Sequence, residues 1–362
     1  MRVLVGMSGG VDSTAACLML KEQGHEVLGL TIRNNDIGLA DGNGCDEPAY
    51  VSDARVLAGK LGMEHHVADE RERFERDVAA PFVRSWLDGM TPNPCIECNP
   101  RFKFRVLTEW AGRLGCDMIA TGHYAGIVCH DGSYYVSRGA DGLKDQSYFL
   151  WKLPQSVLSH TLFPLGGMTK GQVRALVGES GIDIPSRESM EICFIEDDYR
   201  SYLRRRMPDI DSTIGPGKFV DSEGHVIGTH DGYPFYTIGQ RKGLRVAFGE
   251  PRYVIRTNPA RNTVMLGLPE QLNADSMLVG SLSFTGMEPD TVPQGDMEVM
   301  IRYHGRPVPC HIGNAVEGGR FLVHFHETVQ AVTPGQYAVF YRGDRVIGGA
   351  EIVSQRGINQ YL

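Results

Sequence analysis

Apolar and polar residues alternate in blocks along the first third of the chain. Arg2–Met7 is an apolar run that ends at a loop of Gly and Ser, and Thr14–Gln23 then carries apolar residues at helical spacing. A second apolar run, His25–Ile32, is followed by the helical segment Asp53–Leu61. This order of strand, helix, strand and helix predicts an α/β domain built on a doubly wound parallel sheet of the Rossmann-like type.

Two further segments extend this pattern, and one loop interrupts it. Phe102–Leu114 has helical spacing, and the apolar run Met118–Thr121 predicts another strand. Between the second strand and its helix, Asn34–Gly44 is rich in Asn, Asp and Gly, which favours a loop. We expect this loop to be mobile and to lie near the mouth of the site, because functional residues gather on loops.

The pattern changes from about Gly215 onward, where helical periodicity disappears and Gly and Pro turns separate short alternating runs. Closely spaced short strands are typical of a small β-barrel. The predicted strands are Phe235–Ile238, Tyr253–Thr257, Thr263–Leu266, Met297–Tyr303, Val308–Ile312, Arg320–Phe325, Gln336–Tyr341 and Arg345–Ile352. We predict three domains, 1–205, 206–272 and 273–362: a nucleotide-binding domain, a small central domain and a C-terminal β-barrel.

Composition places the chain among globular proteins. Of its 362 residues, 42% are hydrophobic and 22% are charged, and no apolar run approaches the roughly 18 residues of a membrane span. The chain starts with a strand rather than a basic, apolar and small-residue leader, so we expect a cytoplasmic protein. Eight cysteines are too few and too irregularly spaced for a disulfide scaffold, which favours catalytic or metal-binding roles for some of them.

Charge is unevenly distributed along the chain. The net charge of −8 argues against a non-specific nucleic-acid binder, because phosphate contacts need Lys and Arg. Between residues 200 and 262, however, eleven Lys and Arg stand against six Asp and Glu, and Arg204, Arg205 and Arg206 are consecutive. The central part of the chain is therefore either a nucleic-acid-binding surface or an ordinary solvated face.

The loop Gly6–Ser13 follows a strand and opens a helix, where free backbone N–H groups and the helix dipole favour an anion. It lacks the Gly-Lys-Ser ending of a Walker motif, so the loop itself supplies no lysine to a transferring γ-phosphate. It resembles the Ser-Gly-Gly-X-Asp-Ser loop of the ATP pyrophosphatases, which holds pyrophosphate while an acceptor is adenylated. By this resemblance Asp12 helps to hold Mg²⁺, and phosphate is bound by Ser8, Gly9, Gly10 and Ser13. The alternative is a glycine turn used only for packing.

Two cysteine-containing segments are candidates for reactive thiols. Cys95 and Cys98 lie in Thr91–Asn99, which two prolines stiffen and a basic amphipathic segment follows. Helix N-termini and neighbouring cations lower thiol pKa values, so a cysteine here can be a thiolate nucleophile. Cys193, within Glu188–Ile195, lies far away in sequence. Taken alone, each cysteine is more often a buried apolar residue than a reactive one.

Five motifs occur in the order found in one family. They are Thr-Pro-Asn-Pro-X-X-X-Cys-Asn at Thr91–Asn99, Thr-Gly-His-Tyr-Ala at Thr121–Ala125, Lys-Asp-Gln-Ser-Tyr-Phe-Leu at Lys144–Leu150, Ile-Cys-Phe-Ile at Ile192–Ile195 and Tyr-Thr-Ile-Gly-Gln-Arg-Lys-Gly-Leu at Tyr236–Leu244. With the phosphate loop, they make the chain resemble the tRNA-specific 2-thiouridylases over nearly its whole length. The resemblance implies an adenine nucleotide α-hydrolase-like first domain and a sulfurtransferase activity. It also implies that Cys98 is the catalytic nucleophile and that Cys193 carries a persulfide.

The resemblance further implies binding residues, position by position. The expected ATP contacts are Gly6, Met7, Ser8, Gly9, Gly10, Val11, Asp12, Ser13, Ile32 and Gly122. The target uridine is expected to meet Asn93, Pro94 and Cys95, and the rest of the tRNA to meet His123, Lys144, Asp145, Gln146, Arg302, Tyr303 and Gln336. The chain departs from the family pattern twice: many members have Asp at the position of Cys95, and the usual Trp-containing acidic segment after the second strand is here Arg33–Asp36.

Cys95 and Cys98 form a Cys-X-X-Cys pair, which also favours a metal or an iron–sulfur cluster. Together with Cys193 they offer three ligands for a [4Fe-4S] cluster whose free iron binds sulfide, an arrangement that some relatives are thought to use. Zinc is less favoured, because the chain has no second Cys-X-X-Cys and no His pair at the usual ligand spacing. Persulfide and cluster routes both stay open at this point.

The implied reaction uses ATP to adenylate the C2 oxygen of the wobble uridine (U34) in a tRNA anticodon, releases pyrophosphate and AMP, and puts sulfur in place of the oxygen. The implied partners are the tRNA anticodon loop and a persulfide donor such as a cysteine desulfurase or a sulfur-relay protein. In the persulfide route a Cys98–Cys193 disulfide remains and must be reduced. The alternatives are an adenylating enzyme of the amide-forming synthetase type, which needs no reactive cysteine pair, and a non-catalytic RNA-binding module.

Overall fold

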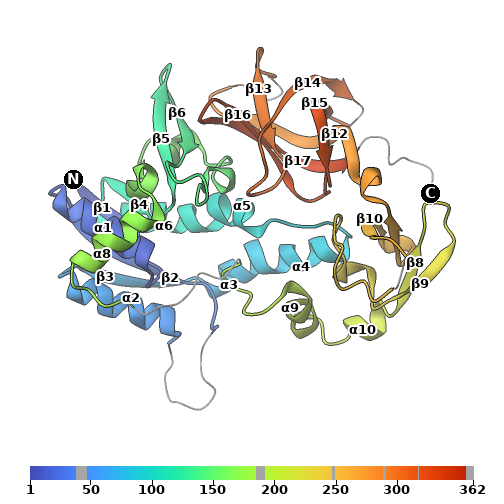
Figure 1. The fold of residues 1–362 in the computed structure, drawn as a ribbon. Coiled ribbons are helices and arrows are strands. Elements are labelled where there is room, and N and C mark those ends of the chain that lie inside the picture. Colours follow the sequence, from blue (N-terminus) through green and yellow to red (C-terminus); the bar gives the residue numbers. More distant parts are fainter. Residues whose placement is uncertain (38–46, 185–191, 247–248, 288–290, 317, 356–362) are drawn as a thin grey trace.

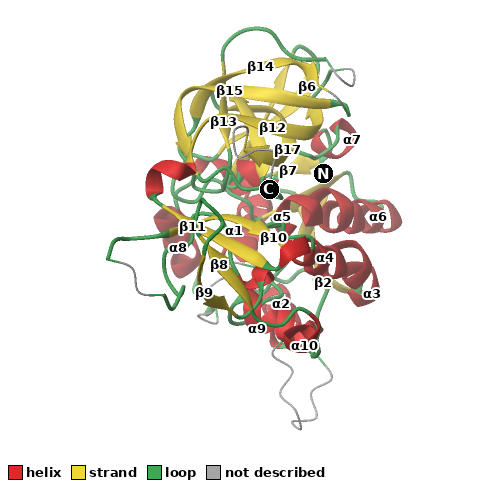
Figure 2. Cartoon of the chain, turned by 90° about the vertical axis from the view of Figure 1, so that its right-hand side faces the viewer, coloured by secondary structure: helices red, strands yellow, loops and turns green. Residues whose placement is uncertain are grey.

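The computed structural model describes residues 1–37, 47–184, 192–246, 249–287, 291–316 and 318–355. The parallel sheet and its helices lie at one end of an elongated molecule, and a small sheet lies at the other (Figure 1). A β-barrel sits above the helical layer, as Figure 2 shows from the side. Of the predicted loop Asn34–Gly44, only residues 34–37 are described, and the rest lies outside these ranges.

Helices cover both faces of the parallel sheet. Its strands, in spatial order, are β3 (His65–Asp69), β2 (Glu26–Arg33), β1 (Arg2–Gly6), β4 (Met118–Thr121) and β7 (Thr161–Leu162). Val3 and Val5 pack with α1 (Val11–Glu22) and α2 (Ala49–Lys60), whereas Leu4 packs with α6 (Phe104–Leu114) on the other face. Because successive side chains of a strand point to opposite faces, this burial confirms the predicted doubly wound sheet.

The chain between β3 and β4 forms two helical runs, and each contains a π-helical turn. The first run is α3 (Arg71–Phe74), η1 (Glu75–Ala79) and α4 (Ala80–Leu87), and the second is α5 (Pro94–Cys98), η2 (Asn99–Lys103) and α6. The predicted helix Phe102–Leu114 therefore starts earlier, at Pro94, because a proline suits the first helical position, where no N–H is needed. π-Helical turns are rare and often mark functional sites.

A hairpin that the sequence pattern did not predict leaves this domain after β4. It consists of β5 (Ala125–His130) and β6 (Ser133–Arg138), and β6 pairs with the last strand of the barrel through Ser137 and Arg345. The sequence did contain a signal for the hairpin that was overlooked: Asp131-Gly132, with φ values of +49° and +77°, is a two-residue hairpin turn. Beyond it, the chain returns through η3 (Ser147–Phe149), α7 (Gln155–Leu158), β7, η4 (Pro164–Gly167) and α8 (Lys170–Glu179).

The central domain is a four-stranded sheet preceded by two helices. Its elements are α9 (Tyr199–Arg206), α10 (Ile210–Thr213), β8 (Gly217–Val220), β9 (Val226–His230), β10 (Tyr253–Asn258), η6 (Pro259–Arg261) and β11 (Thr263–Gly267), with the sheet order β10-β11-β8-β9. The predicted strand Phe235–Ile238 is wrong, because a 3₁₀ turn, η5 (Tyr233–Phe235), occupies its start. Pro234 fixes its own φ and offers no N–H for a sheet.

The C-terminal domain is a closed barrel of six strands, which confirms the predicted β-barrel. Five of these strands were predicted, and the first, Asn273–Phe284, was missed. After η7 (Pro269–Leu272), its strands are β12 (Asn273–Phe284), β13 (Met297–Met300), β14 (Val308–Val316), β15 (Arg320–Gln330), β16 (Tyr337–Arg342) and β17 (Arg345–Gln355). Pairing between β12 and β17 closes the barrel, and Met277, Val323 and Phe340 are fully buried inside it. Closure leaves no unpaired edge between the first and last strands.

Candidate active site

Hydrogen bonds among its own residues hold the phosphate loop in one conformation. The Ser13 hydroxyl donates to the Gly10 carbonyl at 3.1 Å and accepts the Ser8 backbone N–H at 3.2 Å. Gly9 has a φ of +74°, and a Cβ there would lie 2.7 Å from the Tyr50 carbonyl oxygen, so only glycine fits. Helix α1 begins directly after Gly10. The loop therefore faces a helix N-terminus, which suits an anion.

The other predicted ATP contacts border this loop. A Cβ on Gly122, which directly follows β4, would lie 2.7 Å from the carbonyl carbon of Asp12, so the strand end and the loop touch. Ile32 is half-buried on β2, the neighbour of β1 in the sheet. These residues thus meet at the carboxyl edge of the parallel sheet, where open α/β sheets bind their ligands.

A lysine that sequence reasoning missed lies against the loop. Lys170 is the first residue of α8, and its Nζ donates to Asp12 Oδ1 at 2.6 Å. The Tyr124 hydroxyl donates to the same oxygen at 2.7 Å. Burial, followed by this bond to a carboxylate, raises the pKa of Tyr124. Lys170 and Asp12 are 158 positions apart, and the only local signal was the capping box that begins α8.

The three motif cysteines gather at the same edge of the sheet. Cys95 and Cys98 lie on α5, and Cys193 precedes α9. All three are free thiols. Negative charge on Cys193 raises the pKa of Cys95 and of Cys98, so the sulfurs lie within electrostatic reach of one another. The structure therefore brings together the residues that the sequence separates.

A short path of contacts joins Cys193 to the phosphate loop. The Asn34 side-chain amide lies 3.9 Å from Cys193 Sγ, within the range of a weak hydrogen bond to sulfur. The Tyr50 hydroxyl donates to Asn34 Oδ1 at 3.3 Å, and the Tyr50 carbonyl packs against Gly9. Only two side chains therefore separate the exposed thiol of Cys193 from the glycine turn.

Aromatic packing fixes the backbone at Cys193. The next residue, Phe194, is buried, and its ring meets Phe74, Phe82 and Tyr202 edge-on at centroid distances of 5.3, 5.4 and 5.4 Å. Each such pair contributes about 0.5–1.5 kcal/mol beyond the burial of its area. The side chain of Cys193 is therefore exposed on an anchored segment.

The π-helical turn η2 supplies a cation to the thiols. Lys103, its last residue, lowers the pKa of all three cysteines, and its backbone N–H bonds to the Cys98 sulfur. The Lys103 ammonium lies 3.4 Å from His123 Nε2, and His123 Nδ1 lies 2.6 Å from Thr121 Oγ1. Burial, assisted by Lys103, holds the pKa of His123 well below its ordinary value. His123, an expected tRNA contact, is therefore neutral, and its Nε2 accepts a hydrogen bond from the Lys103 ammonium.

Burial nevertheless dominates the acidity of the thiols. It raises the pKa of Cys98 to about 12 and that of Cys95 to about 11. The expectation of lowered thiol pKa values is therefore wrong for the protein without its substrates. The single charge of Lys103, shared among three thiols, offsets only part of the desolvation. Cys95 and Cys98 are therefore protonated at neutral pH.

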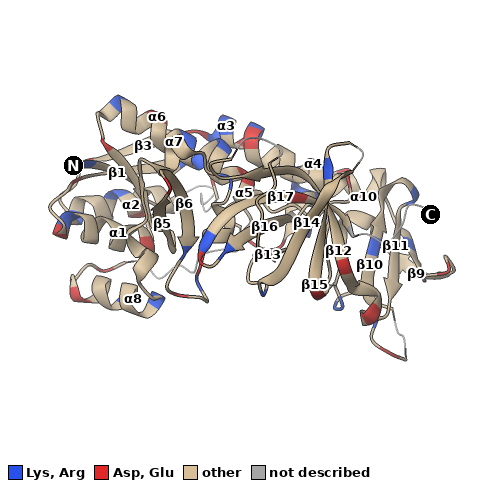
Figure 3. Ribbon diagram, turned by 90° about the horizontal axis from the view of Figure 1, so that it is seen from above, with Lys and Arg blue, Asp and Glu red and all other residues tan. Residues whose placement is uncertain are grey.

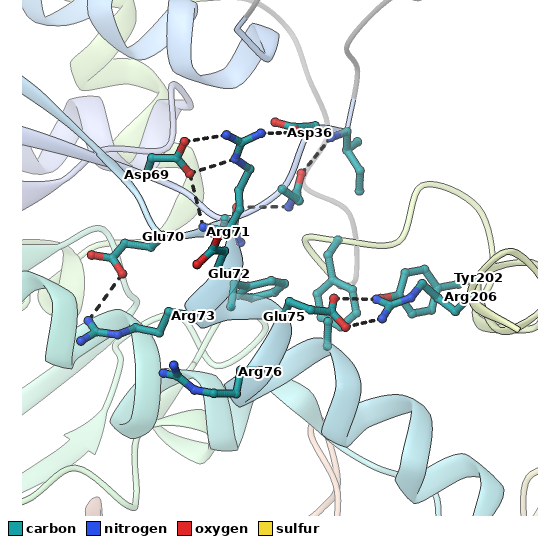
Figure 4. A pocket seen from close by; sticks show the side chains of 16 residues that line it. Asp36, Asp69, Glu70, Arg71, Glu72, Arg73, Glu75, Arg76, Tyr202 and Arg206 are labelled. Atoms are coloured by element: carbon teal, nitrogen blue, oxygen red, sulfur yellow. Dashed lines mark hydrogen bonds and ion pairs between the residues drawn. The ribbon is translucent and has the colours of Figure 1, made fainter.

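An open pocket of about 1010 Å³ lies beside Cys193 (Figure 4). Phe194 and the thiol's neighbour Asn34 belong to its wall. Many of the side chains in the wall are charged, and several of these charges are paired, as in the contacts of Arg71 with Asp36 and Asp69. Its lining residues are Asn34, Asn35, Asp36, Ile37, Asp69, Glu70, Arg71, Glu72, Arg73, Phe74, Glu75, Arg76, Ala79, Phe194, Tyr202 and Arg206. The pocket gives solvent a route to the carboxyl ends of β2 and β3.

The barrel contributes residues to the cysteine site. Tyr303, in the turn after β13, lies with its ring centroid 4.3 Å from that of Phe149. Burial raises the pKa of Tyr303, and the charges of Asp145 and Cys95 add to this effect. Arg302, the next predicted tRNA contact, is exposed. Of these predicted RNA-binding residues, Tyr303 therefore lies within electrostatic reach of Cys95.

The segment expected to meet the target base is clamped against the barrel. The Thr91 backbone N–H donates to the Pro334 carbonyl at 2.9 Å, and Gln336 Nε2 donates to the Thr91 carbonyl at 2.7 Å. Asn93 occupies the N-cap position of α5 without a side-chain capping hydrogen bond and is half-buried, and Pro94 is buried. Gln336 thus shapes the cysteine loop through a direct contact, whatever it binds in addition.

The predicted tRNA contacts 144–146 differ in exposure. Gln146 is half-buried, and its Oε1 accepts the Tyr124 backbone N–H at 3.0 Å while its own N–H donates to the Tyr124 carbonyl at 2.8 Å. Asp145 accepts the Ser147 hydroxyl at 2.8 Å. Lys144 is exposed. Lys144 therefore faces solvent, whereas Asp145 and Gln146 hold the backbone beside His123.

Glu97 connects α5 to the barrel core. Its Oε1 accepts hydrogen bonds from the Tyr337 hydroxyl at 2.8 Å and from Lys152 Nζ at 2.6 Å. Burial alone would raise the pKa of Glu97, but Lys152 and Tyr337 together hold it below its ordinary value. The cysteine helix is therefore fastened to β16 by a partly buried, charge-assisted contact.

The basic run that begins the central domain does not form a free cationic patch. Arg204 pairs with Asp211, Arg205 with Asp197, and Arg206 with Glu75. In the view of Figure 3, Lys and Arg are spread along the whole molecule and interleaved with Asp and Glu. For Arg204–Arg206 the interpretation as a solvated, ion-paired face is the one that holds.

Three family descriptions match consecutive parts of the chain. Residues 1–197 match the HUP domain of a tRNA methyl transferase family, residues 203–268 its PRC-barrel domain, and residues 274–352 an aminomethyltransferase β-barrel domain. Among curated proteins, the tRNA-specific 2-thiouridylase MnmA 3 of Phocaeicola vulgatus is 51% identical over 362 residues, which cover 99% of this chain and 96% of that protein. The chain belongs to the tRNA-specific 2-thiouridylase family. The 2-thiouridylase of Cytophaga hutchinsonii is 43% identical over 98% of this chain and 97% of its own.

Solved structures share less with this 2-thiouridylase family member. A predicted subunit of a tRNA methyltransferase from Methanocaldococcus jannaschii is 20% identical, covers 58% of this chain and 87% of its own, and has a TM-score of 0.34. Such a score supports no functional conclusion. Within the described ranges, no helix is both long enough and apolar enough to cross a membrane.

Mg²⁺ and a [4Fe-4S] cluster, the two metal groups considered for this family member, fit the site differently. Mg²⁺ is commonly held by one or two carboxylates together with substrate phosphates, so Asp12 beside the phosphate loop suits it. A [4Fe-4S] cluster needs converging thiolates. Among the described residues, no group of three or more His, Cys, Asp or Glu side chains is arranged to hold a metal ion. Cys95, Cys98 and Cys193, as placed here, do not fit a cluster.

Proposed function

We propose that this protein replaces the C2 oxygen of the wobble uridine (U34) in tRNA anticodons by sulfur, at the expense of ATP. The observation that carries the proposal is the contact path from Cys193 through Asn34 and Tyr50 to Gly9, which connects a thiol to a pyrophosphate loop. Methyl transfer, named in the description of the first domain's family, needs neither of these features. Membership of the 2-thiouridylase family supports the same reaction.

The nucleotide half of the site activates the uracil oxygen. The C2 oxygen attacks the α-phosphate of ATP, and pyrophosphate leaves toward the N–H groups of the Gly9–Gly10 turn and the start of α1. Asp12 and the phosphates would hold Mg²⁺, which supplies charge stabilisation for the leaving pyrophosphate. The product is an O-adenylated uridine, in which AMP is a good leaving group.

The thiol half of the site delivers sulfur. The terminal sulfur of a Cys193 persulfide attacks C2, and AMP leaves, so that uracil and Cys193 are joined through a disulfide. The Cys98 thiolate then attacks Cys193 Sγ and breaks its bond to the transferred sulfur. The transferred sulfur stays on C2, and a Cys98–Cys193 disulfide forms. A thiol reductant returns both cysteines to the free state. Lys103 stabilises the thiolates that these steps require.

The proposed substrates reach the site from different directions. The target base leaves the anticodon stack to meet Asn93, Pro94 and Cys95, as enzymes acting on a single base require. Exposed Arg302 and Lys144 are suited to phosphate contacts. The persulfide donor, such as a cysteine desulfurase or sulfur-relay protein of the cytoplasm, must reach Cys193. The polar pocket beside that thiol offers such a route.

An amide-forming synthetase is less well supported. It would use the phosphate loop but would have no use for Cys98 and Cys193, which here lie within electrostatic reach of each other. A non-catalytic RNA-binding module would likewise need no Asp12 beside the glycine turn. Both alternatives leave the gathering of the thiols without a function.

The decisive experiment is reconstitution with defined components. The protein is purified anaerobically, its iron is counted, and it is incubated with unmodified tRNA, Mg·ATP and a persulfide donor. Nucleosides are then analysed by mass spectrometry. We expect 2-thiouridine at the wobble position, one AMP per sulfur transferred, and no iron requirement. Loss of all activity on removal of bound iron would favour the cluster route, and absence of 2-thiouridine with iron-loaded and iron-free protein alike would refute the proposed function.

A further inference from the structure

The phosphate loop lacks a lysine of its own, yet a lysine occupies its mouth. Lys170 Nζ lies 2.6 Å from Asp12 Oδ1, at the first turn of α1. The side chains of Lys170 and Asp12 are 23% and 29% exposed, so this pair is sheltered but open to a ligand. Tyr124 donates to the same carboxylate oxygen at 2.7 Å. Asp12 is therefore held by two donors from outside the loop.

Helix α8 is built to keep Lys170 at this position. Thr169 and Gln172 form a capping box, and the Lys170 backbone N–H donates to Asp141 Oδ2 at 2.9 Å. Val173 and Val177 bury the inner face of α8 against Ala15 of α1 and Tyr124. The start of α8 is thereby fixed relative to the start of α1. The lysine reaches the loop from a rigid element rather than from a free surface.

A second cation follows one turn later on the same helix. Arg174 is exposed, and its positive charge acts on the Tyr124 hydroxyl that bonds Asp12. Residues four positions apart on a helix lie on one face. Lys170 and Arg174 thus place two positive charges opposite the single negative charge of Asp12. A pyrophosphate group, with several negative charges, complements such an arrangement.

We propose that Lys170, with Arg174 behind it, forms the second half of the pyrophosphate-binding site and takes the role that Walker lysines have within their own loops. This inference rests on the proposed use of ATP. Without nucleotide, Lys170 keeps Asp12 in an ion pair. With Mg·ATP bound, Asp12 would hold the metal, and the Lys170 ammonium would be free to contact the β- and γ-phosphate oxygens. Pyrophosphate release restores the ion pair.

The test measures binding rather than turnover. Mg·pyrophosphate, Mg·ATP and AMP are titrated calorimetrically into the wild-type protein and into Lys170→Ala, Lys170→Arg and Arg174→Ala. We expect Lys170→Ala to weaken pyrophosphate and ATP binding roughly 10- to 100-fold, as for lost charge-assisted hydrogen bonds, while AMP affinity stays unchanged. Lys170→Arg should restore most of the affinity, and Arg174→Ala should cause a smaller loss of the same kind.

The matched control is Lys60→Ala, which removes a lysine that bonds the Asp183 carbonyl at the surface. It should leave all three affinities unchanged. A purely structural role of Lys170 would lower affinity for AMP and pyrophosphate alike, and that result, or wild-type pyrophosphate binding by Lys170→Ala, would overturn the inference. The proposed function fails differently: wild-type protein would then bind Mg·pyrophosphate with the predicted dependence on Lys170 but form no 2-thiouridine.

Discussion

The two halves of the site are constructed in different ways. The phosphate loop is one continuous stretch, and its internal hydrogen bonds join residues no more than five positions apart. The thiol half takes Cys98 from a helix and Cys193 from a segment whose contact with Asn34 spans 159 positions. The loop conformation is set by β1 and α1, and other elements complete it, whereas the thiol half depends entirely on packing among several elements. A local motif can therefore survive many changes that would scatter the thiols.

The largest expected effect separates sulfur transfer from adenylation. Cys98→Ser and Cys193→Ser should each lower 2-thiouridine formation by at least about 10³-fold, because the two thiols act as one unit. ATP-dependent adenylation of tRNA should persist in both variants, since the phosphate loop is untouched. The assay pairs 2-thiouridine quantification with release of labelled pyrophosphate.

Cys129→Ser is the control for these variants, because Cys129 is an exposed free thiol on β5 outside the site. It should thiolate tRNA at the wild-type rate. Undiminished 2-thiouridine from Cys98→Ser would remove that residue from the mechanism.

A substitution in the phosphate loop should impair the nucleotide half and leave the thiols unaffected. Asp12→Ala should lower pyrophosphate and AMP release roughly 100-fold, because it removes the carboxylate expected to position Mg²⁺. The alkylation rate of Cys193 by iodoacetamide should not change, since that thiol is held by Phe194 and its aromatic neighbours. Equal loss of both properties would show that the two halves are not built independently.

The alkylation rate of Cys98 should increase gradually with pH. Burial raises the pKa of Cys98 to about 12, so its thiolate fraction is small at neutral pH and grows with every increase in pH below that value. Alkylation of Cys98 in a Cys95→Ser, Cys193→Ser background should rise about tenfold per pH unit between pH 7 and pH 9, whereas an unperturbed thiol near pKa 8.5 begins to level off.

Lys103→Met should slow this alkylation further, because it removes the charge that opposes desolvation. Lys103→Arg retains the charge and should preserve the rate. A plateau below pH 9 in the parent background would contradict control of Cys98 by burial.

The smallest effect concerns the attachment of the thiol half to the barrel. Tyr337→Phe removes the hydrogen bond to Glu97 and should lower the free energy of unfolding by about 1 kcal/mol. Lys152→Met removes the other donor to the same oxygen. A double-mutant cycle by chemical denaturation should show that the two losses are not additive, because both partners share one carboxylate. Strict additivity would mean that the Glu97 contact does not couple them.

Sequence reasoning was most successful where structure is local. The strand at Met118–Thr121, the phosphate loop before α1 and the short strands of the barrel follow from periodicity, glycine placement and turns. It failed at Phe235, where a proline turn interrupts an apolar run, and at β5 and β6, whose Asp131-Gly132 turn was overlooked. Both errors concern turn residues that are present in the sequence but were given too little weight against the apolar pattern.

The residues of the candidate site likewise fall into two groups, those that a motif marks and those that only tertiary contacts reveal. Resemblance to a family marked Cys98 and Cys193, but only packing shows that their sulfurs interact and that burial raises the pKa of Cys98. Lys103 and Lys170 escaped notice because a lone lysine has no distinctive pattern around it. Both become informative once the fold puts them within reach of a thiol or a carboxylate.

The sequence by itself determined the parallel sheet, the anion loop and the presence of a barrel, because short-range sterics and side-chain periodicity act within a few residues. Tertiary structure alone decided that three thiols converge, that Lys170 completes the loop and that the barrel clamps the cysteine helix. Those contacts join positions far apart along the chain, and their energies depend on burial and distance that exist only after folding.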